Sequence, residues 1–456
     1  MSDHASPATR SDAPDVSATS ATSATSATSA TTKSAPAPSR LRTVIGTGVG
    51  NALEWYDWNV YAIFTPFFAS QFFPSADPTS ALLSTLAIFA VGFLMRPLGG
   101  LVFGRLSDRK GRRAAMVGSI ALAAAGSLLI GLAPTYATIG VGASALLVFA
   151  RLVQGLAHGG ELPAAQTYVA EMAPRERRGL WSSLIYISGT CGIMVATVLA
   201  AVLSSFLSED QLHAWGWRVP FVIGGLLGLY ALIMRLRLEE TDAFEKQADT
   251  PDHHEPRTSV WRGFWENRAA CLRVIGLTLG GTVVYYTWAV SAPAQAISLK
   301  GIEASSALWA GVLANLVFLV ALPLFGALSD RVGRKPILYG SYIGGAVLAF
   351  PLNWFIQDQA WQLAVSMTTA MLFMSAGAAI TPAVFAEMFP TRLRTTGVGF
   401  PYAIAVAACG GSAPYLQTWL TSNGQGDLFL GYTVVLLLLA LAVVHRMPET
   451  KNTDLT

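Results

Sequence analysis

The sequence predicts an all-α membrane protein with twelve transmembrane helices in two pseudo-symmetric six-helix bundles. Hydrophobic residues make up 53% of the 456 residues and charged residues only 12%, about half the charged fraction of a typical soluble protein. Apolar stretches of roughly 20 residues, the length of a helix that crosses a bilayer, recur along the chain. A ten-residue motif also occurs once in each half of the chain. These observations exclude an ordinary soluble enzyme.

Residues 1–43 differ in composition from the rest of the chain. Ala-Thr-Ser repeats run from Ala18 to Thr31, and large apolar side chains are nearly absent. Such a composition cannot bury enough apolar surface to fold. The segment also lacks the apolar core and cleavage site of a signal peptide. We expect a disordered Ala/Thr/Ser-rich cytoplasmic tail.

The N-terminal bundle is expected at residues 44–237. Six apolar stretches, separated by short polar or Gly- and Pro-containing segments, define its helices. Basic loops follow the second and the fourth stretch, which indicates that these two helices end on the same side. The helices are predicted at 44–70, 81–103, 114–133, 138–163, 180–204 and 218–237.

Residues 238–270 form the longest polar interruption after the N-terminal tail. This stretch is rich in acidic residues and contains the pair His253 and His254. We interpret it as a cytoplasmic central loop that separates the two bundles. The C-terminal bundle is expected at 271–446, and 447–456 as a short cytoplasmic tail. Its helices are predicted at 271–297, 305–327, 336–356, 361–386, 396–421 and 428–445.

Lysine and arginine residues predict the orientation of the helices. If the spans alternate in direction, nearly all of the 30 Lys and Arg residues lie on the side that carries both termini. Arg218 and Lys300 lie at the opposite face, and Arg96 and Arg151 lie inside spans. Because positively charged loops stay in the cytoplasm, both termini are expected there, in a multi-pass protein of the plasma (inner) membrane.

Two motifs indicate that the halves are repeats of one another. GRLSDRKGRR at 104–113 recurs as GALSDRVGRK at 326–335, with seven of ten positions identical. EMAPRERR, which begins at Glu171, has its counterpart in EMFPTRLR, which begins at Glu387. Duplicated six-helix halves imply a pseudo-two-fold axis and a substrate path between them.

Charged residues inside the predicted spans are the candidate site. A charge near the bilayer centre costs at least about 2.5 to 3.5 kcal/mol, so it needs a partner, water or a function. One alternative is that these charges pair permanently as structural ion pairs across the bundle. The residues are Glu54 and Asp57 in the first span, Arg96 in the second, and Arg151, His158 and Glu161 in the fourth.

Helical periodicity arranges these residues on two faces. Glu54 and Asp57 are three positions apart and share a face of the first helix. At 100° per residue, Arg151, Gln154, His158 and Glu161 form one polar stripe on the fourth helix, which we expect to face an aqueous cavity. Glycines 155, 159 and 160 lie nearby and indicate close packing of a neighbouring helix as an alternative. Pro163 indicates a kink or an early end of this helix.

These residue types suggest two roles. Arg96 and Arg151, with Gln154 beside them, suit a substrate carboxylate, because a guanidinium stays charged and binds a carboxylate bidentately. Asp57, Glu54 or Glu161 suits a coupled proton, since substrate that competes for the arginine raises the pKa of the neighbouring carboxyl. His158 is a further proton-handling candidate, or alternatively a hydrogen-bonded interior histidine.

Aromatic residues of the seventh span are weaker candidates for substrate binding. Tyr285, Tyr286 and Trp288 are expected to line the C-terminal half of the cavity, where they offer hydroxyl donors or stacking surfaces. Tyr402 of the eleventh span is similar. The alternative is packing between helices.

Other classes of function find no support in the sequence. The motifs GxSxG, HExxH and GxxxxGK[ST] are absent, which disfavours a membrane enzyme and a nucleotide-driven pump. Cys191, Cys271 and Cys409 share no metal-ligand spacing, so no metal or other cofactor is expected. The basic residues form no continuous face, which excludes nucleic acid as a partner. The expected partners are a small-molecule carboxylate, protons and the lipid bilayer, and a monomer suffices.

The order of several motifs resembles the major facilitator superfamily, and within it the metabolite:proton symporters, which include permeases for α-ketoglutarate, citrate, shikimate and proline or betaine. The resemblance covers roughly residues 45–445 and implies alternating access by two rocking six-helix bundles. After Gly-Gly-Glu the family usually has an aromatic and small residues, whereas Leu162 and Pro163 follow here. The motifs are GNALEWYD at 50–57, GFLMRPLGG at 92–100, GRLSDRKGRR, RLVQGLAHGGE at 151–161, WGWRVPF at 215–221, EMFPTRLR and GGSAP at 410–414.

The same resemblance implies a cytoplasmic gate. Asp108 and Arg112 would latch it in the outward-open state, and Asp330 and Arg334 would perform the mirrored role. The alternative, a positively charged topology anchor, leaves Asp108 and the glycine spacing unexplained.

The expected function is proton-coupled symport of a small organic acid, α-ketoglutarate or a related dicarboxylate. The alternatives are a proline/betaine-type compatible-solute symporter and a drug/proton antiporter. Two buried arginines disfavour lipophilic cations, and Arg151 adds a second positive charge that a zwitterion does not require.

Overall fold

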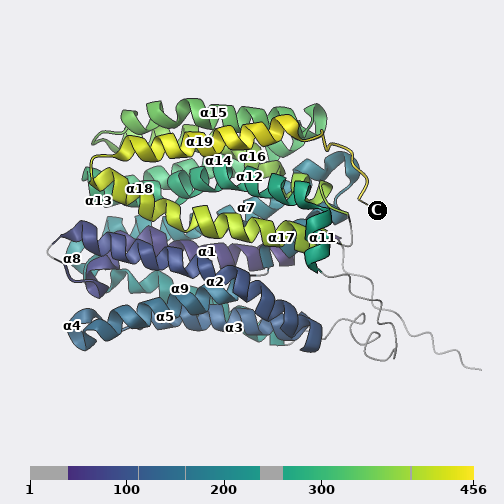
Figure 1. Cartoon of the computed structure of the whole chain (residues 1–456). Coiled ribbons are helices and arrows are strands. Elements are labelled where there is room, and N and C mark those ends of the chain that lie inside the picture. The colour runs from purple at the N-terminus through teal and green to yellow at the C-terminus, as the bar shows by residue number, and fades with distance from the viewer. Residues whose placement is uncertain are drawn as a thin grey trace, which may run out of the picture. The chain divides into compact units, whose positions relative to one another are not determined.

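Most of the chain beyond the N-terminal segment is helical. The computed structural model describes residues 40–75, 77–110, 112–159, 161–236, 260–390 and 393–455. The expected disorder of the N-terminal tail, and most of the predicted central loop, fall outside these residues. Within them the helices run side by side, with the C-terminus at the end where α1 begins and α11 lies (Figure 1). Residues 40–456 form one compact unit.

The helices of the first half follow the predicted order. The predicted second, fifth and sixth stretches coincide with α2, α7 and α9. The elements of the first half are α1 (Arg40–Phe72), α2 (Pro78–Lys110), α3 (Arg112–Gly131), α4 (Tyr136–Ile139), α5 (Val141–Ala157), α6 (Glu161–Met172), the short η1 (Arg175–Arg177), α7 (Arg178–Phe206), α8 (Glu209–Gln211), η2 (Leu212–Gly216) and α9 (Arg218–Leu236).

The second half contains two spans that π-helical turns divide. One turn, η3, lies between α12 and α13, and the other, η5, lies between α17 and α18. The elements are α11 (Val260–Glu266), α12 (Arg268–Tyr285), η3 (Tyr286–Ser291), α13 (Ala292–Lys300), α14 (Ala304–Val332), α15 (Arg334–Phe355), α16 (Ala360–Glu387), α17 (Arg394–Ala405), η5 (Val406–Gly410), α18 (Ser412–Ser422) and α19 (Gly426–Arg446).

Eight helices of the described residues are long and apolar enough to cross a membrane. The other four predicted stretches are also helical. Polar, Gly and Pro residues lower the hydropathy of α1 and α15, and α5, α17 and α18 are short. The prediction of twelve crossings, and the predicted bundle boundaries, therefore stay predictions. The predicted central loop at 238–270 contains α11 and the first residues of α12 at its end.

The prediction of one helix over 138–163 is wrong. Gly140 has φ +57°, which separates α4 from α5, and α5 ends at Ala157 with His158 as its C-cap. A new helix, α6, begins at Glu161. The early end that Pro163 suggested is thus confirmed, because the helix ends at Ala157 and a new one begins at Glu161.

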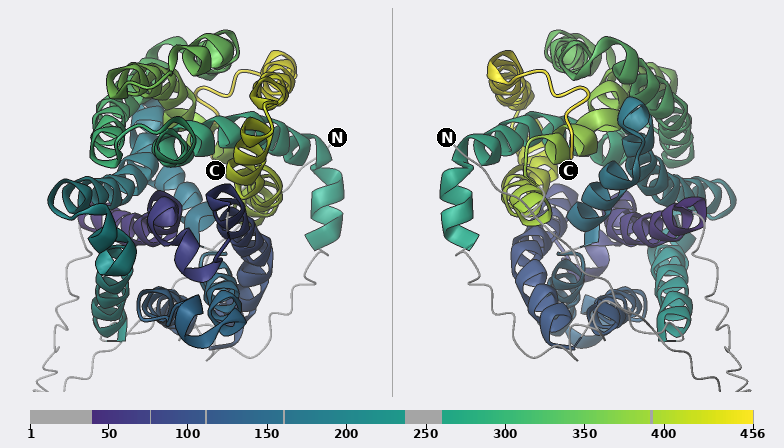
Figure 2. Two further views of the ribbon diagram at one scale, coloured as in Figure 1. Left: turned by 90° about the vertical axis from the view of Figure 1, so that its left-hand side faces the viewer. Right: turned by 90° about the vertical axis from the view of Figure 1, so that its right-hand side faces the viewer.

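Long-range packing joins the two halves mainly through α7. This helix packs against α1 in its own half and against α14 and α16 of the other half. At the crossing of α7 and α14, a Cβ atom on Gly179 would lie 2.7 Å from the carbonyl oxygen of Gly326, so no side chain fits. Viewed end-on, the earlier and the later helices lie on opposite sides of this contact (Figure 2).

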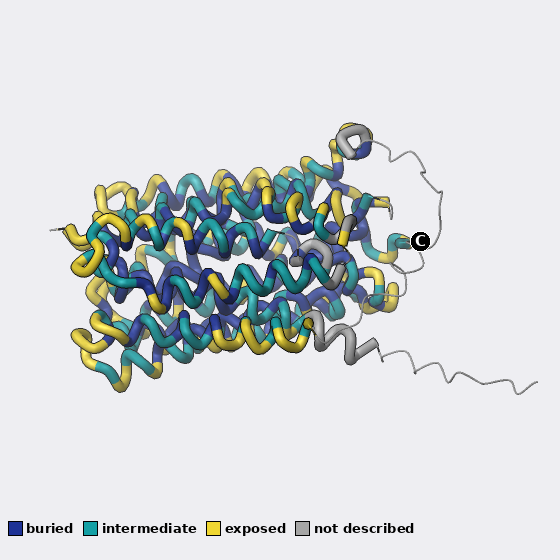
Figure 3. Tube along the Cα trace, turned by 90° about the horizontal axis from the view of Figure 1, so that it is seen from below, coloured by how far each residue is buried: buried dark blue, intermediate teal, exposed yellow. Residues whose placement is uncertain are grey.

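Burial follows the pattern of a membrane protein. Buried residues lie along the interior of the helices, and exposed ones lie at the loops and on outward faces (Figure 3). Many exposed side chains are large and apolar, among them Leu94, Leu226, Val347 and Leu438. Such faces suit contact with lipid. The polar residues of the candidate site lie inside the bundle instead.

Candidate functional site

A cavity of about 1180 Å³, a volume that includes space open to solvent, lies among helices of both halves. The first half contributes α1, α2, α6 and α7, and the second half contributes α12, η3, α15, α16, α17, η5 and α19. The repeated motifs of the two halves predicted a substrate path between them. We call this cavity the central cavity.

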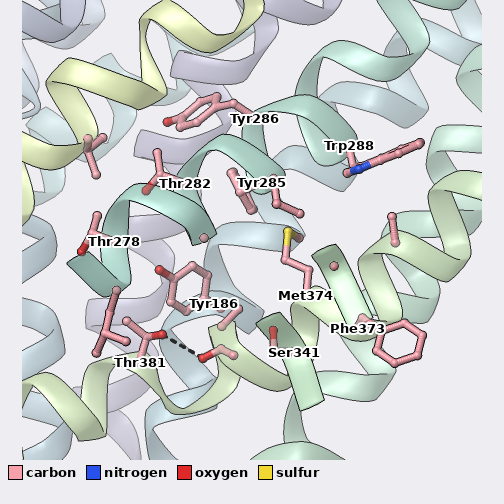
Figure 4. A pocket seen from close by; sticks show the side chains of 18 of the residues that line it. Tyr186, Thr278, Thr282, Tyr285, Tyr286, Trp288, Ser341, Phe373, Met374 and Thr381 are labelled. Atoms are coloured by element: carbon pink, nitrogen blue, oxygen red, sulfur yellow. Dashed lines mark hydrogen bonds between the residues drawn. The ribbon is translucent and has the colours of Figure 1, made fainter. Parts of the chain in front are cut away.

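Aromatic rings and hydroxyl groups line the second-half side of the central cavity (Figure 4). Tyr285 and Tyr286 both line it, as does Trp288, in agreement with the expected positions. Tyr285 packs edge-on against Trp55 of α1, with ring centroids 5.5 Å apart, and its buried hydroxyl has no hydrogen-bond partner. These rings therefore connect the halves and also offer an unused donor.

Arg96 of α2 reaches the central cavity. Its guanidinium carbon lies 4.1 Å from the ring centroid of Trp58 and 4.4 Å from that of Phe93. Among the described residues no carboxylate forms an ion pair with it. Aromatic faces thus hold this cation at the cavity wall without neutralising it.

Arg151 of α5 is placed differently. Its side chain is fully buried and does not line the central cavity. The guanidinium carbon lies 4.0 Å from the centroid of the same Trp58 ring and 4.3 Å from that of Tyr61, while Nε and Nη2 have no hydrogen-bond partner. Trp58 therefore contacts both arginines, a role that the sequence analysis missed.

Gln154 links Arg151 to Asp57. Arg151 Nη1 donates a hydrogen bond to Gln154 Oε1 at 2.8 Å, and Gln154 Nε2 donates to Asp57 Oδ2 at 3.0 Å. Ser127 of α3 donates its hydroxyl to the other oxygen of Asp57. The alternative of a permanent ion pair between arginine and Asp57 therefore does not describe this contact, because an amide stands between the charges. Ser127 was also missed, since only the folded chain brings α3 beside α1.

His158 lies between the two acidic residues of α1. Its Nδ1 is 3.4 Å from Glu54 Oε1, and its Nε2 is 3.5 Å from Asp57 Oδ2. Glu54 lines the central cavity, whereas Asp57 and His158 do not. All three side chains are largely buried. The shared face that the spacing of Glu54 and Asp57 predicted therefore meets the predicted stripe of α5 at His158.

The stripe does not extend to Glu161. This residue begins α6 after the break at the end of α5, so the continuous helical wheel that placed Glu161 beside His158 is wrong. Its side chain lies outside the described residues. Gly155 confirms the packing alternative, because a Cβ atom there would lie 2.0 Å from the carbonyl oxygen of Gly92 on α2.

The predicted gate residues of the second half form a contact between the halves. Asp330, near the end of α14, accepts hydrogen bonds from the backbone N–H groups of Gly179 and Leu180 at 2.8 and 2.9 Å. These groups belong to the first turn of α7, where a carboxylate is favoured. Arg334 Nη1 donates to Asp330 at 2.8 Å. The side chains of the counterparts Asp108 and Arg112 fall outside the described residues.

A second set of contacts joins the halves at the same end. Arg178 of α7 donates to Glu387 of α16 at 3.0 Å, and Arg394 of α17 donates to Glu171 of α6 at 2.5 Å. Glu387 also accepts a hydrogen bond from Arg334 at 3.1 Å. The similarity between EMAPRERR and EMFPTRLR was the sequence signal for these contacts, but the sequence analysis assigned no role to these residues.

The C-terminal residues lie across this end. The backbone carbonyl oxygens of Asn452 and Thr453 accept hydrogen bonds from Arg175 and Arg178 of the first half. The Glu449 carboxylate accepts from the backbone N–H groups of Arg334 and Lys335 at 2.9 and 3.0 Å. Although burial acts in the opposite direction, these N–H donors hold the pKa of Glu449 below its ordinary value.

Sequence comparisons identify related transporters. The model of the Major Facilitator Superfamily matches residues 47–293, and that of the family "Sugar (and other) transporter" matches residues 241–456. The alpha-ketoglutarate permease of Escherichia coli is 36% identical over 91% of this chain and 95% of that protein. A putative proline/betaine transporter of Staphylococcus haemolyticus is 33% identical over 90% of this chain and 89% of its own length.

Solved structures share the fold. The partially occluded inward-open form of the xylose transporter XylE from E. coli has a TM-score of 0.69 at 19% identity and covers 90% of this chain and 98% of its own. XylE bound to 6-bromo-6-deoxy-D-glucose has a TM-score of 0.71 at 19% identity, with coverages of 90% and 96%.

Proposed function

The chain belongs to the Major Facilitator Superfamily, and from this premise we propose that it is a proton-coupled symporter of a small organic acid. It is a multi-pass membrane transporter and not an enzyme. The proposed substrate is α-ketoglutarate or a related dicarboxylate. The 36% identity to an alpha-ketoglutarate permease supports this choice.

Arg96 carries the proposal. Its guanidinium lies at the wall of the central cavity and has no carboxylate partner among the described residues. A charge in this position is costly unless a ligand compensates it, and a substrate carboxylate provides that compensation bidentately. Tyr285 and Tyr286 offer hydroxyl donors from the opposite half. Arg151, held by Gln154, adds positive potential from behind Trp58.

The acidic residues of α1 suit the coupled proton. Glu54 lines the same cavity as Arg96, so an anion that enters is repelled by the ionised carboxylate and favours its protonated form. Proton and anion then bind together, and the coupling is reciprocal. Asp57 and His158 receive the proton next, and Glu161 is the remaining candidate. Symport follows because neither the anion nor the proton binds well alone.

Alternating access requires a gate that opens and closes at the end where Asp330 lies. We propose that Asp330 and Arg334, with Asp108 and Arg112 as their counterparts, hold that end closed while the cavity faces the opposite side. Release of the first turn of α7 from Asp330 then lets the halves rock apart. Both termini are cytoplasmic in this proposal, in the plasma (inner) membrane.

The proposed organisation is a cytoplasmic tail at 1–43, six-helix bundles at 44–237 and 271–446, a central loop at 238–270 and a tail at 447–456. We propose that a monomer suffices, because both halves that line the central cavity belong to the same chain.

The second candidate is symport of proline or betaine. Trp55, Trp58 and Tyr285 surround part of the cavity, and aromatic faces bind quaternary ammonium groups. A relative with 33% identity carries that name. A drug/proton antiporter is the weaker alternative, because the Arg96 guanidinium repels cations.

Uptake into proteoliposomes tests the proposal. Radiolabelled α-ketoglutarate should accumulate under an inward proton gradient, and unlabelled dicarboxylates should compete better than monocarboxylates or betaine. Accumulation of betaine or proline instead would move the chain to the second candidate. Equilibration without accumulation under the gradient would contradict proton coupling.

A further inference from the structure

A second cavity lies wholly among helices of the first half. Its volume is about 540 Å³, including space open to solvent, and α1, α3, α5 and α9 supply its walls together with His158. Glu54 is the residue that lines both this cavity and the central one. Asp57 and His158 line only this second cavity, which we call the side cavity.

Small residues create the side cavity. Gly224 and Gly228 of α9 and Ala123 and Ala124 of α3 leave space beside α1. A Cβ atom on Gly228 would lie 2.8 Å from that of Ala124, and one on Gly224 would lie 3.3 Å from Asp57 Oδ1. Side chains at Gly224 and Gly228 would collide with these neighbours, so the two glycines let α9 pack closely beside α1 and α3 at the side cavity.

The side cavity has a direction. Asp57, His158 and Gly224 lie at one end, and Gly50 of α1, Ser119 of α3 and Ala231 of α9 lie toward the other. At this second end α1 and α3 begin and α9 ends. The C-terminus lies at the same end (Figure 1). Seven residues of α1 separate Asp57 from Gly50, a rise of about 10 Å.

We propose that protons leave the binding site through the side cavity, by a relay from Glu54 through His158 to Asp57, while the substrate leaves through the central cavity. This inference rests on the proposed symport and adds a separate exit for the proton. The substrate takes a different route in this proposal, because Arg96 lines the central cavity and not the side cavity.

The relay balances as a proton transfer. Glu54, protonated from the central cavity, gives its proton to Nδ1 of a neutral His158, and His158 Nε2 gives its proton to the Asp57 carboxylate. Glu54 becomes ionised, Asp57 becomes neutral and the imidazole stays neutral in its other tautomer. Asp57 then passes the proton to water in the side cavity. His158 regains its first tautomer when Nε2 takes one proton from that water and Nδ1 gives one back to it. The separations of 3.4 and 3.5 Å close by small side-chain movements.

Charged and polar groups of several helices surround His158 and Asp57. The carboxylates of Glu54 and Asp57 approach the His158 ring from α1, and both would stabilise the ring in its protonated, positively charged form. On α5, Arg151 reaches Asp57 through Gln154, and Ser127 of α3 donates to Asp57. These hydrogen bonds fix Asp57 beside His158, and release of its proton then depends on water in the side cavity. Arg96 on α2 faces the central cavity instead.

Substitutions that fill the side cavity test this route. Ala123→Leu should lower proton-driven accumulation by up to about a hundredfold, the smaller end of what a positioned proton-transfer group contributes, while exchange of labelled for unlabelled substrate stays within about twofold. Exchange needs no net proton release. Ala125→Leu, on the same helix but at an exposed position, is the matched control and should change neither. His158→Gln, which cannot relay a proton, should lower accumulation at least as strongly as Ala123→Leu does.

The measurements are uptake and exchange in proteoliposomes, with a pH-sensitive dye inside to follow protons. Unchanged accumulation in Ala123→Leu and His158→Gln would overturn the separate route. Equal losses of accumulation and exchange in both would also overturn it, because they indicate a packing role. The wild-type protein tests the proposed function independently: whichever of α-ketoglutarate, betaine or proline it accumulates serves as the substrate for the variants.

Discussion

Arg178 donates a hydrogen bond to Glu387 at 3.0 Å, and these residues occupy opposite ends of the two copies of one octapeptide. Arg178 is the last residue of EMAPRERR, and Glu387 is the first residue of EMFPTRLR. The reciprocal pair, Arg394 with Glu171, joins the last residue of the second copy to the first residue of the first. Each half therefore supplies the acid for the other half's arginine, as a pseudo-two-fold axis requires.

Glu387→Gln should destabilise the protein. The carboxylate is fully buried and accepts from Arg178, Arg334 and Thr450. Its loss removes the carboxylate partner of the buried Arg178 guanidinium and leaves Arg334 with Asp330. Breaking a buried pair costs about 3 to 5 kcal/mol. A clear fall in the Tm of the purified protein in detergent is expected. Glu176→Gln, at an exposed position, is the control, and equal Tm values for both variants would contradict the role of this contact.

Asp330→Asn tests the gate. The carboxylate accepts from two backbone N–H groups of α7 and from Arg334, and loss of such a cap costs about 0.5 to 2 kcal/mol. The closed state at this end should become less populated, so the uptake rate should change by a few-fold to about thirtyfold. Asp358→Asn, in an exposed turn, is the control. An unchanged initial rate of uptake in Asp330→Asn would remove the latch from the mechanism.

The fold could be predicted to a large extent because its signals are local. Length and hydropathy of the apolar stretches give helices, and the repeated motifs indicate two related halves. The break after His158 was expected from Pro163, but the helical wheel was still continued across it to Glu161. The π turns at η3 and η5 have no local sequence signal, because they arise where neighbouring helices pack.

The candidate site could be predicted only in part. Charged residues in apolar stretches identified Arg96, Asp57 and Glu54, since their cost in a membrane is independent of tertiary structure. The contacts of Trp58 and Ser127 depend on which helices lie side by side, so a single sequence did not indicate them. For the same reason Arg151 was expected in the cavity, whereas the indole of Trp58 lies between it and that space.

Glu449 gives the stability a pH dependence. Its pKa is lowered in the folded protein, so its ionised contacts stabilise above the ordinary value of 4.5 and are lost as pH falls through the folded value. Glu449→Gln should therefore lower the Tm at neutral pH, and the difference from wild type should shrink as pH falls below 4.5. Thermal unfolding in detergent between neutral and acidic pH measures this. A difference that stays constant across that range would contradict the assignment to Glu449.

The two arginines that contact Trp58 should differ in their effect on transport. Arg96 lines the central cavity, whereas Arg151 does not. Arg96→Met should therefore raise the substrate concentration for half-maximal exchange by at least about tenfold, since a charge-assisted hydrogen bond contributes about 1.5 to 3 kcal/mol. Arg151→Met removes a buried charge whose Nε and Nη2 have no partner, so its effect on that concentration should be smaller.

Arg151→Met should instead affect proton coupling. Gln154 loses the donor that orients it, and Asp57 then loses part of the support that Gln154 gives to its ionised form. Accumulation under a proton gradient should fall more than exchange does. Arg151→Lys keeps the charge but not the fork geometry, and it should restore only part of the accumulation. If Arg151→Met weakens substrate binding as much as Arg96→Met does, Trp58 does not separate Arg151 from the substrate, and both guanidinium groups bind it.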